Sequence, residues 1–212
     1  MRTLPKMKTA APGGTSTAED EAHAVNNSVD FITKLSTVGG LFLTKKFSAD
    51  GSVEAYDDAA SFKISEVQVG SLEELSAFLE GIHEDSHASV IRGKFVGKDK
   101  AVKGNVKGTY MRQNVNFDDC PHHWFMVDID KYEPGFSDPV HDPVQAIKDF
   151  IEEQLPACFK DVSFHWQLSS SAGTPGKEHT LKAHVWFWSE TAYTSAQMYA
   201  WRRLSSCVLP WR

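Results

Sequence analysis

Long hydrophobic runs are missing from this sequence. No stretch of about 18 apolar residues is available to form a membrane-spanning helix, and no apolar stretch of signal-peptide length follows the first methionine. Cysteine is scarce, with three widely separated residues, so neither a disulfide framework nor a structural zinc site is expected, although His122 and His123 follow Cys120 closely. These absences predict a reduced, cytoplasmic environment and no membrane partner.

Several short catalytic motifs are absent as well. The chain has no G-x-x-x-x-G-K-[S/T], G-x-G-x-x-G, G-x-S-x-G or H-E-x-x-H sequence, which removes support for P-loop, dinucleotide-binding, serine-hydrolase and zincin chemistry. Positive charge is in the minority, because 22 Lys and Arg stand against 28 Asp and Glu, for a formal net charge of −6. That total alone disfavours a polyanionic partner.

What is present is enough for a folded domain. The chain has 212 residues, 41% of them apolar and 11% aromatic, so one core of ordinary size is expected. Residues 1–28 are rich in Ala, Gly, Pro, Ser and Thr and lack an apolar period, which predicts a flexible tail. We divide the remaining residues, 29–212, into an N-terminal subregion at 29–120 and a C-terminal core at 121–212.

Helix signals occur at three places. Each begins with a residue whose side chain can cap the first amides, and each continues with apolar residues on one face. The predicted starts are Ser71 with Glu74 for a helix over 72–82, Asp142 with Pro143 and Gln145 for a helix whose buried stripe is Val144, Ile147, Phe150 and Ile151, and Thr194 for a helix over 195–203.

Strand signals surround these helices. The strongest is the β-prone run His123–Asp130, and others are centred on Val90-Ile91, at Val162–Leu168 and at Leu181–Trp188. From Trp124 onward the order is strand, helix, strand, strand, helix, which is five-sixths of a split βαββαβ unit. We therefore predict an α+β protein with an RRM-like core, an N-terminal α/β extension, and a last strand that is missing or short. One face of the core sheet should be free.

Two acidic residues in the run His123–Asp130 are the sharpest candidates for chemistry. Asp128 and Asp130 are two residues apart, so both project from the same face of a strand, as does Met126. Carboxylates at the end of an apolar strand are costly to bury without a partner and often hold a divalent cation. They predict a metal site, with a solvated strand end as the alternative.

A second strand carries donors for a phosphate chain. Lys182 and His184 share one face of the strand Leu181–Trp188, about 7 Å apart. The loop before it is small and polar, and its residues Ser169 and Ser171 can approach a phosphate through hydroxyls and backbone amides. A structural histidine and a merely flexible loop are the alternatives for this pattern.

The positive charge is concentrated in one segment. Between Arg92 and Arg112 there are seven Lys or Arg and a single acid, Asp99, which leaves a local net charge of +6 with Phe95 and Tyr110 interleaved. This composition is typical of a nucleic-acid track, although a solvated loop has it too. The basic residues are Arg92, Lys94, Lys98, Lys100, Lys103, Lys107 and Arg112.

Taken in order, these features resemble a known family. HWFMVDIDKYEP followed by VSFHWQLSSSAGTPGKEHTLKAHVWFW is similar to the primase-polymerase domain of the archaeo-eukaryotic primase superfamily, in the form found in primase-helicase proteins of phages and mobile elements. The family's first motif is an apolar-Asp-apolar-Asp strand, matched by Asp128 and Asp130. Its second is a small or basic residue, any residue and then His, matched by Lys182 and His184. The likeness covers roughly residues 40–200.

The resemblance implies template-directed nucleotidyl transfer on single-stranded DNA. Asp128 and Asp130 would bind two Mg²⁺ or Mn²⁺ ions and act in catalysis with His184. The basic segment would follow the template, and a helicase domain or partner in a bacterial or phage-infected host cell is implied by the same family. The incoming NTP or dNTP would be held by Lys182, His184, Ser169 and Ser171.

One feature of the family is missing. A third motif supplies an acid after the helix that follows the second motif, but LSSCVLPWR, which follows the helix predicted at 195–203, contains no Asp or Glu. The last strand of the βαββαβ unit is missing at the same point. We expect either a truncated primase or substitution by Glu133 or Asp138, and we favour truncation, so synthesis should be weak or absent.

Two other functions fit parts of the pattern. Nucleotide-sugar glycosyltransferases also use Asp-x-Asp to hold Mn²⁺ and a diphosphate, but they need a βαβ nucleotide-binding half before the acids. A non-catalytic remnant that binds nucleic acid would keep the basic segment and a vestigial metal site. Binding to single-stranded DNA that is unaffected by Asp128→Ala would identify the remnant.

Overall fold

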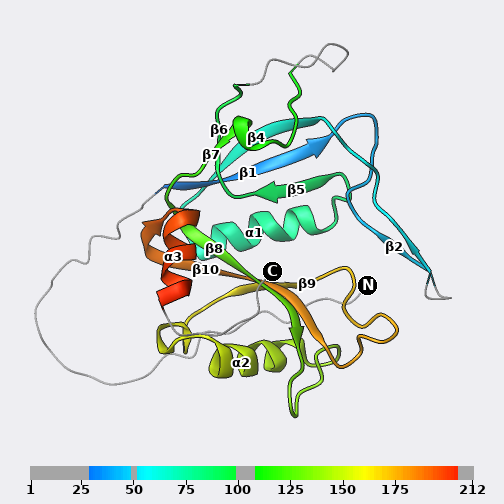
Figure 1. Ribbon diagram of the computed structural model, residues 1–212, viewed down its shortest axis with the longest axis vertical. Coiled ribbons are helices and arrows are strands. Elements are labelled where there is room, and N and C mark those ends of the chain that lie inside the picture. Colours follow the sequence, from blue (N-terminus) through cyan, green and yellow to red (C-terminus); the bar gives the residue numbers. More distant parts are fainter. Residues whose placement is uncertain (1–28, 49–51, 99–107, 205–212) are drawn as a thin grey trace, which may run out of the picture.

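The structure is a computed structural model that describes residues 29–48, 52–98 and 108–204. In these residues the fold is mixed α+β, with small antiparallel sheets and three α-helices (Figure 1). The tail predicted at 1–28 lies outside the described residues. No described helix is long and apolar enough to cross a membrane.

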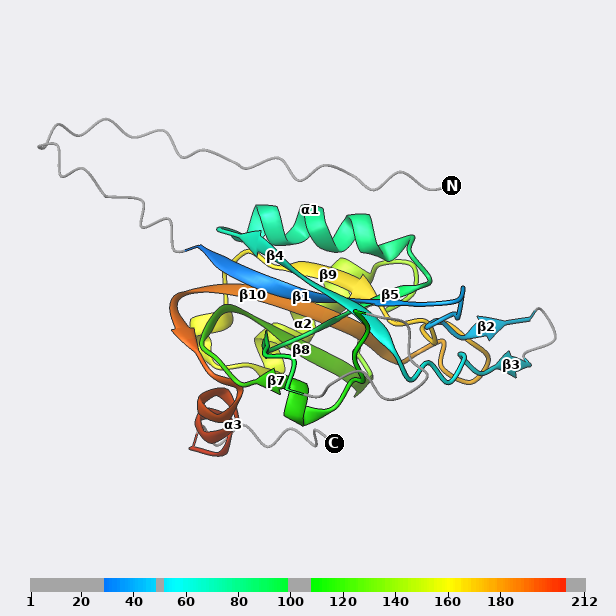
Figure 2. The same cartoon turned by 90° about the horizontal axis from the view of Figure 1, so that it is seen from above.

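The N-terminal subregion is built on an antiparallel sheet with the strand order β4-β1-β5. The central strand β1 pairs over its full length with β4, and α1 follows β4 along the chain. A short hairpin of β2 and β3 extends away from this sheet (Figure 2). The bounds are β1 Asp30–Thr37, β2 Lys46–Phe47, β3 Val53–Glu54, β4 Phe62–Val69, α1 Leu72–His83 and β5 Ala88–Ile91.

The C-terminal core is built on a second antiparallel sheet, with the strand order β8-β10-β9. Two-residue strands β6 and β7 pair with each other and link the two sheets along the chain, with the 3₁₀ turn η1 between them. A second 3₁₀ turn, η2, follows α2. The bounds are β6 Lys94–Phe95, η1 Asn114–Asn116, β7 Phe117–Asp118, β8 His122–Tyr132, α2 Pro143–Gln154, η2 Ala157–Phe159, β9 His165–Leu168, β10 Leu181–Tyr193 and α3 Ser195–Leu204.

All three predicted helices form, and all three predicted caps accept a hydrogen bond. The Ser71 hydroxyl accepts from the Glu74 amide at 3.2 Å, the Asp142 carboxylate from the Gln145 amide at 3.3 Å, and Thr194 Oγ1 from the Gln197 amide at 3.1 Å. These contacts satisfy amides that have no partner inside the first helical turn.

The second helix differs from its prediction in two details. Gln145 does not return to the cap, because its side-chain amide donates to the Asp149 carboxylate one turn later, at 2.8 Å. Val144 is exposed, so it does not belong to the buried stripe. Ile147, Phe150 and Ile151 are buried as predicted, since they lie on the face of α2 that covers the second sheet.

Two strands differ in length from their predictions. β9 begins at His165 and not at Val162, because the turn after η2 places Asp161 in the left-handed region, with φ of 62°, and the next residues are exposed or half-exposed before pairing starts. β10 continues to Tyr193, beyond the predicted end, and its register with β8 shifts after Trp188. No strand follows α3 within the described residues.

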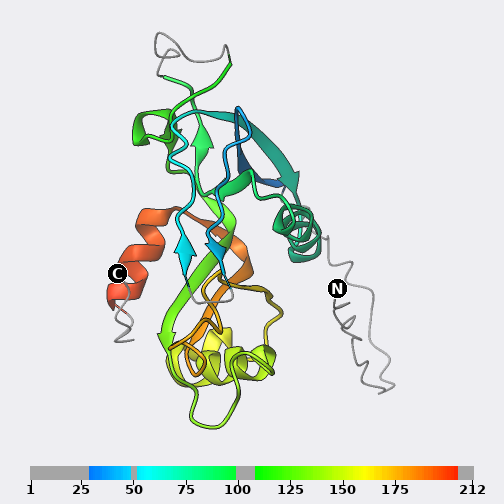
Figure 3. The ribbon, with the colours of Figure 1, turned by 90° about the vertical axis from the view of Figure 1, so that its right-hand side faces the viewer.

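The second sheet is covered on both faces, one of them only in part. The helix α2 packs on the face that carries Ile129, Ala183 and Val185. The opposite face carries Trp124 and Trp186, which pack with residues of β1, β4 and α1 in a second core cluster. Figures 1 and 3 show α1 beside the junction of the two sheets and α2 at the far end of the second sheet. The sheet face opposite α2 was expected to be free. This expectation was wrong for the end of that face that carries Trp124 and Trp186, because the N-terminal subregion packs there.

Candidate functional site

The two predicted residue pairs lie together on the uncovered part of the second sheet. The register of β8 and β10 places His184 opposite Asp128, with His184 Nε2 3.5 Å from Asp128 Oδ1. Lys182 Nζ forms an ion pair with the Asp130 carboxylate and donates to the Asp130 carbonyl oxygen at 3.0 Å. We call Asp128, Asp130, Lys182 and His184 the quartet.

The alternation of each strand produces this arrangement. Ile129 and Ala183 point into the core beneath α2, so their polar neighbours in the quartet point to the other face. An irregularity in the pairing between Leu181 and Ala183 lies at Lys182. The Lys182 side chain is only 12% exposed and its ammonium reaches Asp130, while both carboxylates of the quartet face solvent.

Charge within the quartet is balanced by neighbouring side chains. The hydrogen bond from Lys182 lowers the pKa of Asp130, assisted by the positive charge of Lys182 and Lys131. Asp130 is therefore ionised at neutral pH and available as an oxygen donor. Like-charge repulsion between the two carboxylates is offset by the cationic side chain of Lys182 beside them.

A tryptophan that the sequence did not single out closes one end of the quartet. The ring of Trp186 lies edge-on to His184, with 5.7 Å between ring centroids, and 5.4 Å from the ring of His165 on β9. Trp186 is buried in the core shared with α1. The signal was present in the alternation of β10, because Lys182, His184 and Trp186 share one face.

The two predicted serines differ in their relation to the quartet. The Ser169 amide donates to the Lys182 carbonyl at 2.9 Å, which places Ser169 beside the quartet. Its hydroxyl is buried and has no hydrogen-bond partner among the described residues. Ser171 lies in the following turn, where its carbonyl accepts a hydrogen bond from the Thr174 hydroxyl at 2.9 Å.

The carboxylates fit a divalent cation only with help from a substrate. Among the described residues, no three His, Cys, Asp or Glu side chains converge as a metal-binding group. Asp138, one suggested substitute for the missing third acid, already accepts hydrogen bonds from the amides of Val140 and His141 and pairs with the His141 ring. These contacts lower the pKa of Asp138 to about 2. Two carboxylates with phosphate oxygens and water are nevertheless a common ligand set for Mg²⁺.

The first residue of the basic segment is used inside the fold. The Arg92 guanidinium donates to the carbonyl oxygens of Trp124 and Tyr193 and, at 3.3 Å, to the Ser195 hydroxyl. It also lies over the Trp124 ring, 5.2 Å from the centroid. Burial lowers the pKa of Arg92 against the raising effect of Asp119 and Asp30. Arg92 thus joins the end of β5 to the second sheet.

The other basic residues have different surroundings. Lys94 and Arg112 are exposed, and Lys98 is exposed but 3.2 Å from the Asp118 carboxylate. Lys100, Lys103 and Lys107 lie outside the described residues. The structure therefore brings Arg92 and Arg112 to one place, a surface cavity of about 370 Å³, and leaves Lys94 and Lys98 on the nearby strand and loop.

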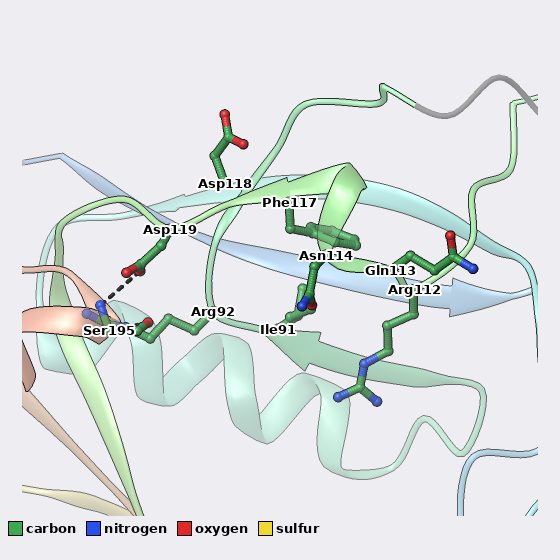
Figure 4. A pocket seen from close by; sticks show the side chains of 9 residues that line it. All are labelled: Ile91, Arg92, Arg112, Gln113, Asn114, Phe117, Asp118, Asp119 and Ser195. Carbon is green, nitrogen blue, oxygen red and sulfur yellow. Dashed lines mark hydrogen bonds between the residues drawn. The ribbon is translucent and has the colours of Figure 1, made fainter. Parts of the chain in front are cut away.

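This cavity lies between the end of β5, the η1–β7 segment and the start of α3 (Figure 4). It contains carboxylates as well as guanidinium groups, and Asp119 accepts hydrogen bonds from the first amides of α3, at 2.8 Å from Ser195 and 3.1 Å from Ala196. The lining residues are Ile91, Arg92, Arg112, Gln113, Asn114, Phe117, Asp118, Asp119 and Ser195.

Comparison with known proteins identifies no relative. No protein-family model, no curated protein and no solved structure matches this chain.

Proposed function

We propose that this chain is a primase-polymerase-like domain that binds an NTP or dNTP and a single-stranded DNA template, with weak or absent nucleotidyl transfer. The observation that carries the proposal is the quartet. Two carboxylates on β8 and two nitrogen donors on β10, Lys182 and His184, face the same solvent-exposed surface, with nitrogen-to-oxygen distances of 3.5 Å or less. Acids for a metal and donors for a triphosphate are the parts that such a reaction needs.

The topology supports the same proposal. The order β8-β10-β9, all antiparallel with α2 between β8 and β9, is the order of the first three strands in a split βαββαβ unit. An RRM-like core of this kind is part of the proposal. A nucleotide-sugar glycosyltransferase has less support, because the described strands before Asp128 pair only in antiparallel fashion and form no βαβ unit.

Each residue of the quartet has a distinct proposed role. Asp128 and Asp130 would hold Mg²⁺ or Mn²⁺, which when bound supplies charge stabilisation for a phosphoryl centre. Lys182 and His184 would donate to the phosphate oxygens, and Ser169, whose amide bonds the Lys182 carbonyl, lies beside them at the end of the neighbouring strand. With no third acid in the described site, the reacting groups would be poorly positioned, which limits the rate.

Nucleotide binding tests the proposal. We expect the double substitution Asp128→Ala/Asp130→Ala to weaken binding of dATP or ATP in Mn²⁺ about tenfold or more, and binding in EDTA to be weak for both proteins. Isothermal titration calorimetry measures both. The matched control is Glu73→Ala/Glu84→Ala, which removes two exposed carboxylates from α1 and its C-cap and therefore changes the net charge by the same amount. The control should bind as the unchanged protein does.

Synthesis is measured on the same proteins. Dinucleotide formation on single-stranded DNA, or extension of a labelled primer, should be slow in the unchanged protein and absent in Asp128→Ala/Asp130→Ala. Equal nucleotide affinity in the double variant and the unchanged protein would overturn the proposed site. Binding of single-stranded DNA that is unaffected by Asp128→Ala, without nucleotide binding or synthesis in the unchanged protein, would identify the non-catalytic remnant.

Binding of single-stranded DNA tests the template surface. We expect Lys94→Ala/Arg112→Ala to weaken binding of an unstructured oligonucleotide at low salt about three- to tenfold, because both exposed side chains are available to phosphates. The slope of log K against log salt should fall by about 0.7 for each lost contact. Lys46→Ala/Lys160→Ala, outside the basic segment, is the control for net charge. An equal loss in both variants would show that the effect is not local.

A further inference from the structure

A cysteine, a histidine and an aspartate form a hydrogen-bonded chain at the start of β1 and β8. The Nδ1 atom of His122 lies 2.8 Å from the Asp30 carboxylate, and its Nε2 atom lies 3.3 Å from Cys120 Sγ. Asp30 is 6% exposed and His122 1% exposed. These three residues come from segments about 90 positions apart, so the fold and not the local sequence brings them together.

The environment of Asp30 determines which nitrogen of His122 carries a proton. Burial raises the pKa of Asp30, but hydrogen bonds from His122 and from the amides of Phe31 and His123 outweigh it and lower the pKa overall. An ionised carboxylate can only accept hydrogen bonds. Nδ1 of His122 must therefore carry a proton, and in the neutral form of the ring Nε2 then presents its lone pair to the Cys120 thiol.

The imidazole and the thiol are both held in position. Phe31 contacts the His122 ring edge-on, with 4.8 Å between centroids, and Trp124 lies 5.2 Å from it on the same strand. Cys120 is partly exposed in the link between β7 and β8, and the Lys94 amide donates to its sulfur. Attack by a small reagent is therefore possible at a thiol whose hydrogen-bond partners are fixed.

The charges around Cys120 make a base necessary. Burial raises the pKa of the Cys120 thiol, as do the carboxylates of Asp30 and Asp119, while the Lys94 amide and Arg92 oppose that effect. The resting group is thus a thiol, which is a poor nucleophile until its proton is removed. His122 is the base within hydrogen-bond reach, and Asp30 would stabilise the imidazolium that forms.

We propose that Cys120, His122 and Asp30 act as nucleophile, general base and positioning acid, and that Cys120 is a site of covalent modification by soft carbon electrophiles. In the step, a bond forms from Cys120 Sγ to the electrophilic carbon while the bond from that carbon to its leaving group breaks. The thiol proton passes to His122 Nε2, and the leaving group departs with the bonding electrons. The site is separate from the quartet and does not depend on the proposed function.

Alkylation by iodoacetamide in the folded protein tests this proposal. One protein keeps Cys120 as its sole cysteine (Cys158→Ser/Cys207→Ser) and a second keeps the exposed Cys158 (Cys120→Ser/Cys207→Ser). Mass spectrometry gives the rate for each from pH 6 to pH 8.5. We expect Cys120 to react at least tenfold faster than Cys158 at pH 7, with a rate that rises less than tenfold per pH unit.

Either of two results would overturn the proposal. One is a Cys120 rate no higher than that of Cys158 at pH 7. The other is a rate that rises tenfold per pH unit throughout the range, as it does for an unassisted thiol below its pKa. Equal rates for the two cysteines in 8 M urea are required as a control, because the proposal depends on the fold.

Substitutions of Asp30 and His122 then show whether Cys120 reacts quickly because a base assists it or only because its thiol is exposed to the reagent. Asp30→Asn offers an amide donor to Nδ1 and so favours the tautomer with a proton on Nε2, which should slow Cys120 alkylation at least tenfold. His122→Gln should slow it similarly, while His123→Gln, whose ring bonds the Ser189 carbonyl, should leave it unchanged. Circular dichroism reports whether each variant is folded; if the buried substitutions unfold the chain, the pH profile of the intact sole-cysteine protein decides alone.

Discussion

Replacement of Trp186 by alanine is expected to destabilise the protein by about 3–5 kcal/mol, the usual cost of removing a buried tryptophan. Trp186 is 4% exposed and packs with Ile32 of β1 and Leu75 and Leu79 of α1. Its loss leaves a cavity in the core where the N-terminal subregion meets the second sheet. Urea unfolding at pH 7, followed by circular dichroism, measures the change in the free energy of unfolding.

The matched control is a tryptophan at the surface. Trp201 on α3 is 39% exposed, and its ring contacts Phe159 with 5.7 Å between centroids. Trp201→Ala should cost less than half as much as Trp186→Ala, since less apolar surface is buried there. A loss below about 1 kcal/mol for Trp186→Ala would contradict the packing of α1 against the second sheet.

Polar contacts reinforce the same docking. Ser76 Oγ of α1 lies 2.7 Å from His165 Nδ1 on β9, and the Gln167 side chain donates to the Leu79 carbonyl at 3.1 Å. Burial lowers the pKa of His165, so its ring is neutral at pH 7. The quartet is therefore bounded by a core that both halves of the chain build, and its geometry depends on the N-terminal subregion.

The local elements were predictable because their signals are local. A helix can be located from its capping residue, here Ser71 or Asp142, and from the apolar period that follows it. Two-residue alternation identifies β8 and β10 in the same way. The docking of α1 on the second sheet was not predictable. From the sequence, Trp124 and Trp186 could be identified only as apolar strand residues. The residues that pack against them belong to β1, β4 and α1, which are distant in the sequence.

The candidate site shows the same division. Alternation along each strand predicted that Asp128 lies on one face with Asp130, and Lys182 with His184. The contact between the two pairs depends on the register of β8 and β10, which cannot be derived from the sequence pattern. Arg92 was predicted to track phosphates, a role that nothing in the structure tests. A positive charge in a basic segment gives no sign that its guanidinium also binds the carbonyl oxygens of Trp124 and Tyr193.

Asp30 is the other residue whose loss should be severe. We expect Asp30→Ala to destabilise the protein by about 3–5 kcal/mol at pH 7, because it leaves the buried His122 Nδ1 and the amides of Phe31 and His123 without their acceptor. Asp57 is a control that also accepts a backbone amide, from Phe42 at 2.6 Å, but is exposed. Asp57→Ala should cost about 1 kcal/mol or less.

The effect of Asp30 should also depend on pH in a defined direction. The pKa of Asp30 is lowered in the folded protein from the ordinary value of 3.8, so the folded state prefers the ionised form. The stability that Asp30 contributes is then present above the unfolded-state pKa and is lost as the pH falls through the folded-state value. The difference in unfolding free energy between Asp30→Ala and the unchanged protein should therefore shrink as the pH falls below about pH 4. A difference that stays constant down to pH 3 would show that the Asp30 carboxylate is not ionised in the fold, and with it the assigned tautomer of His122 would be lost.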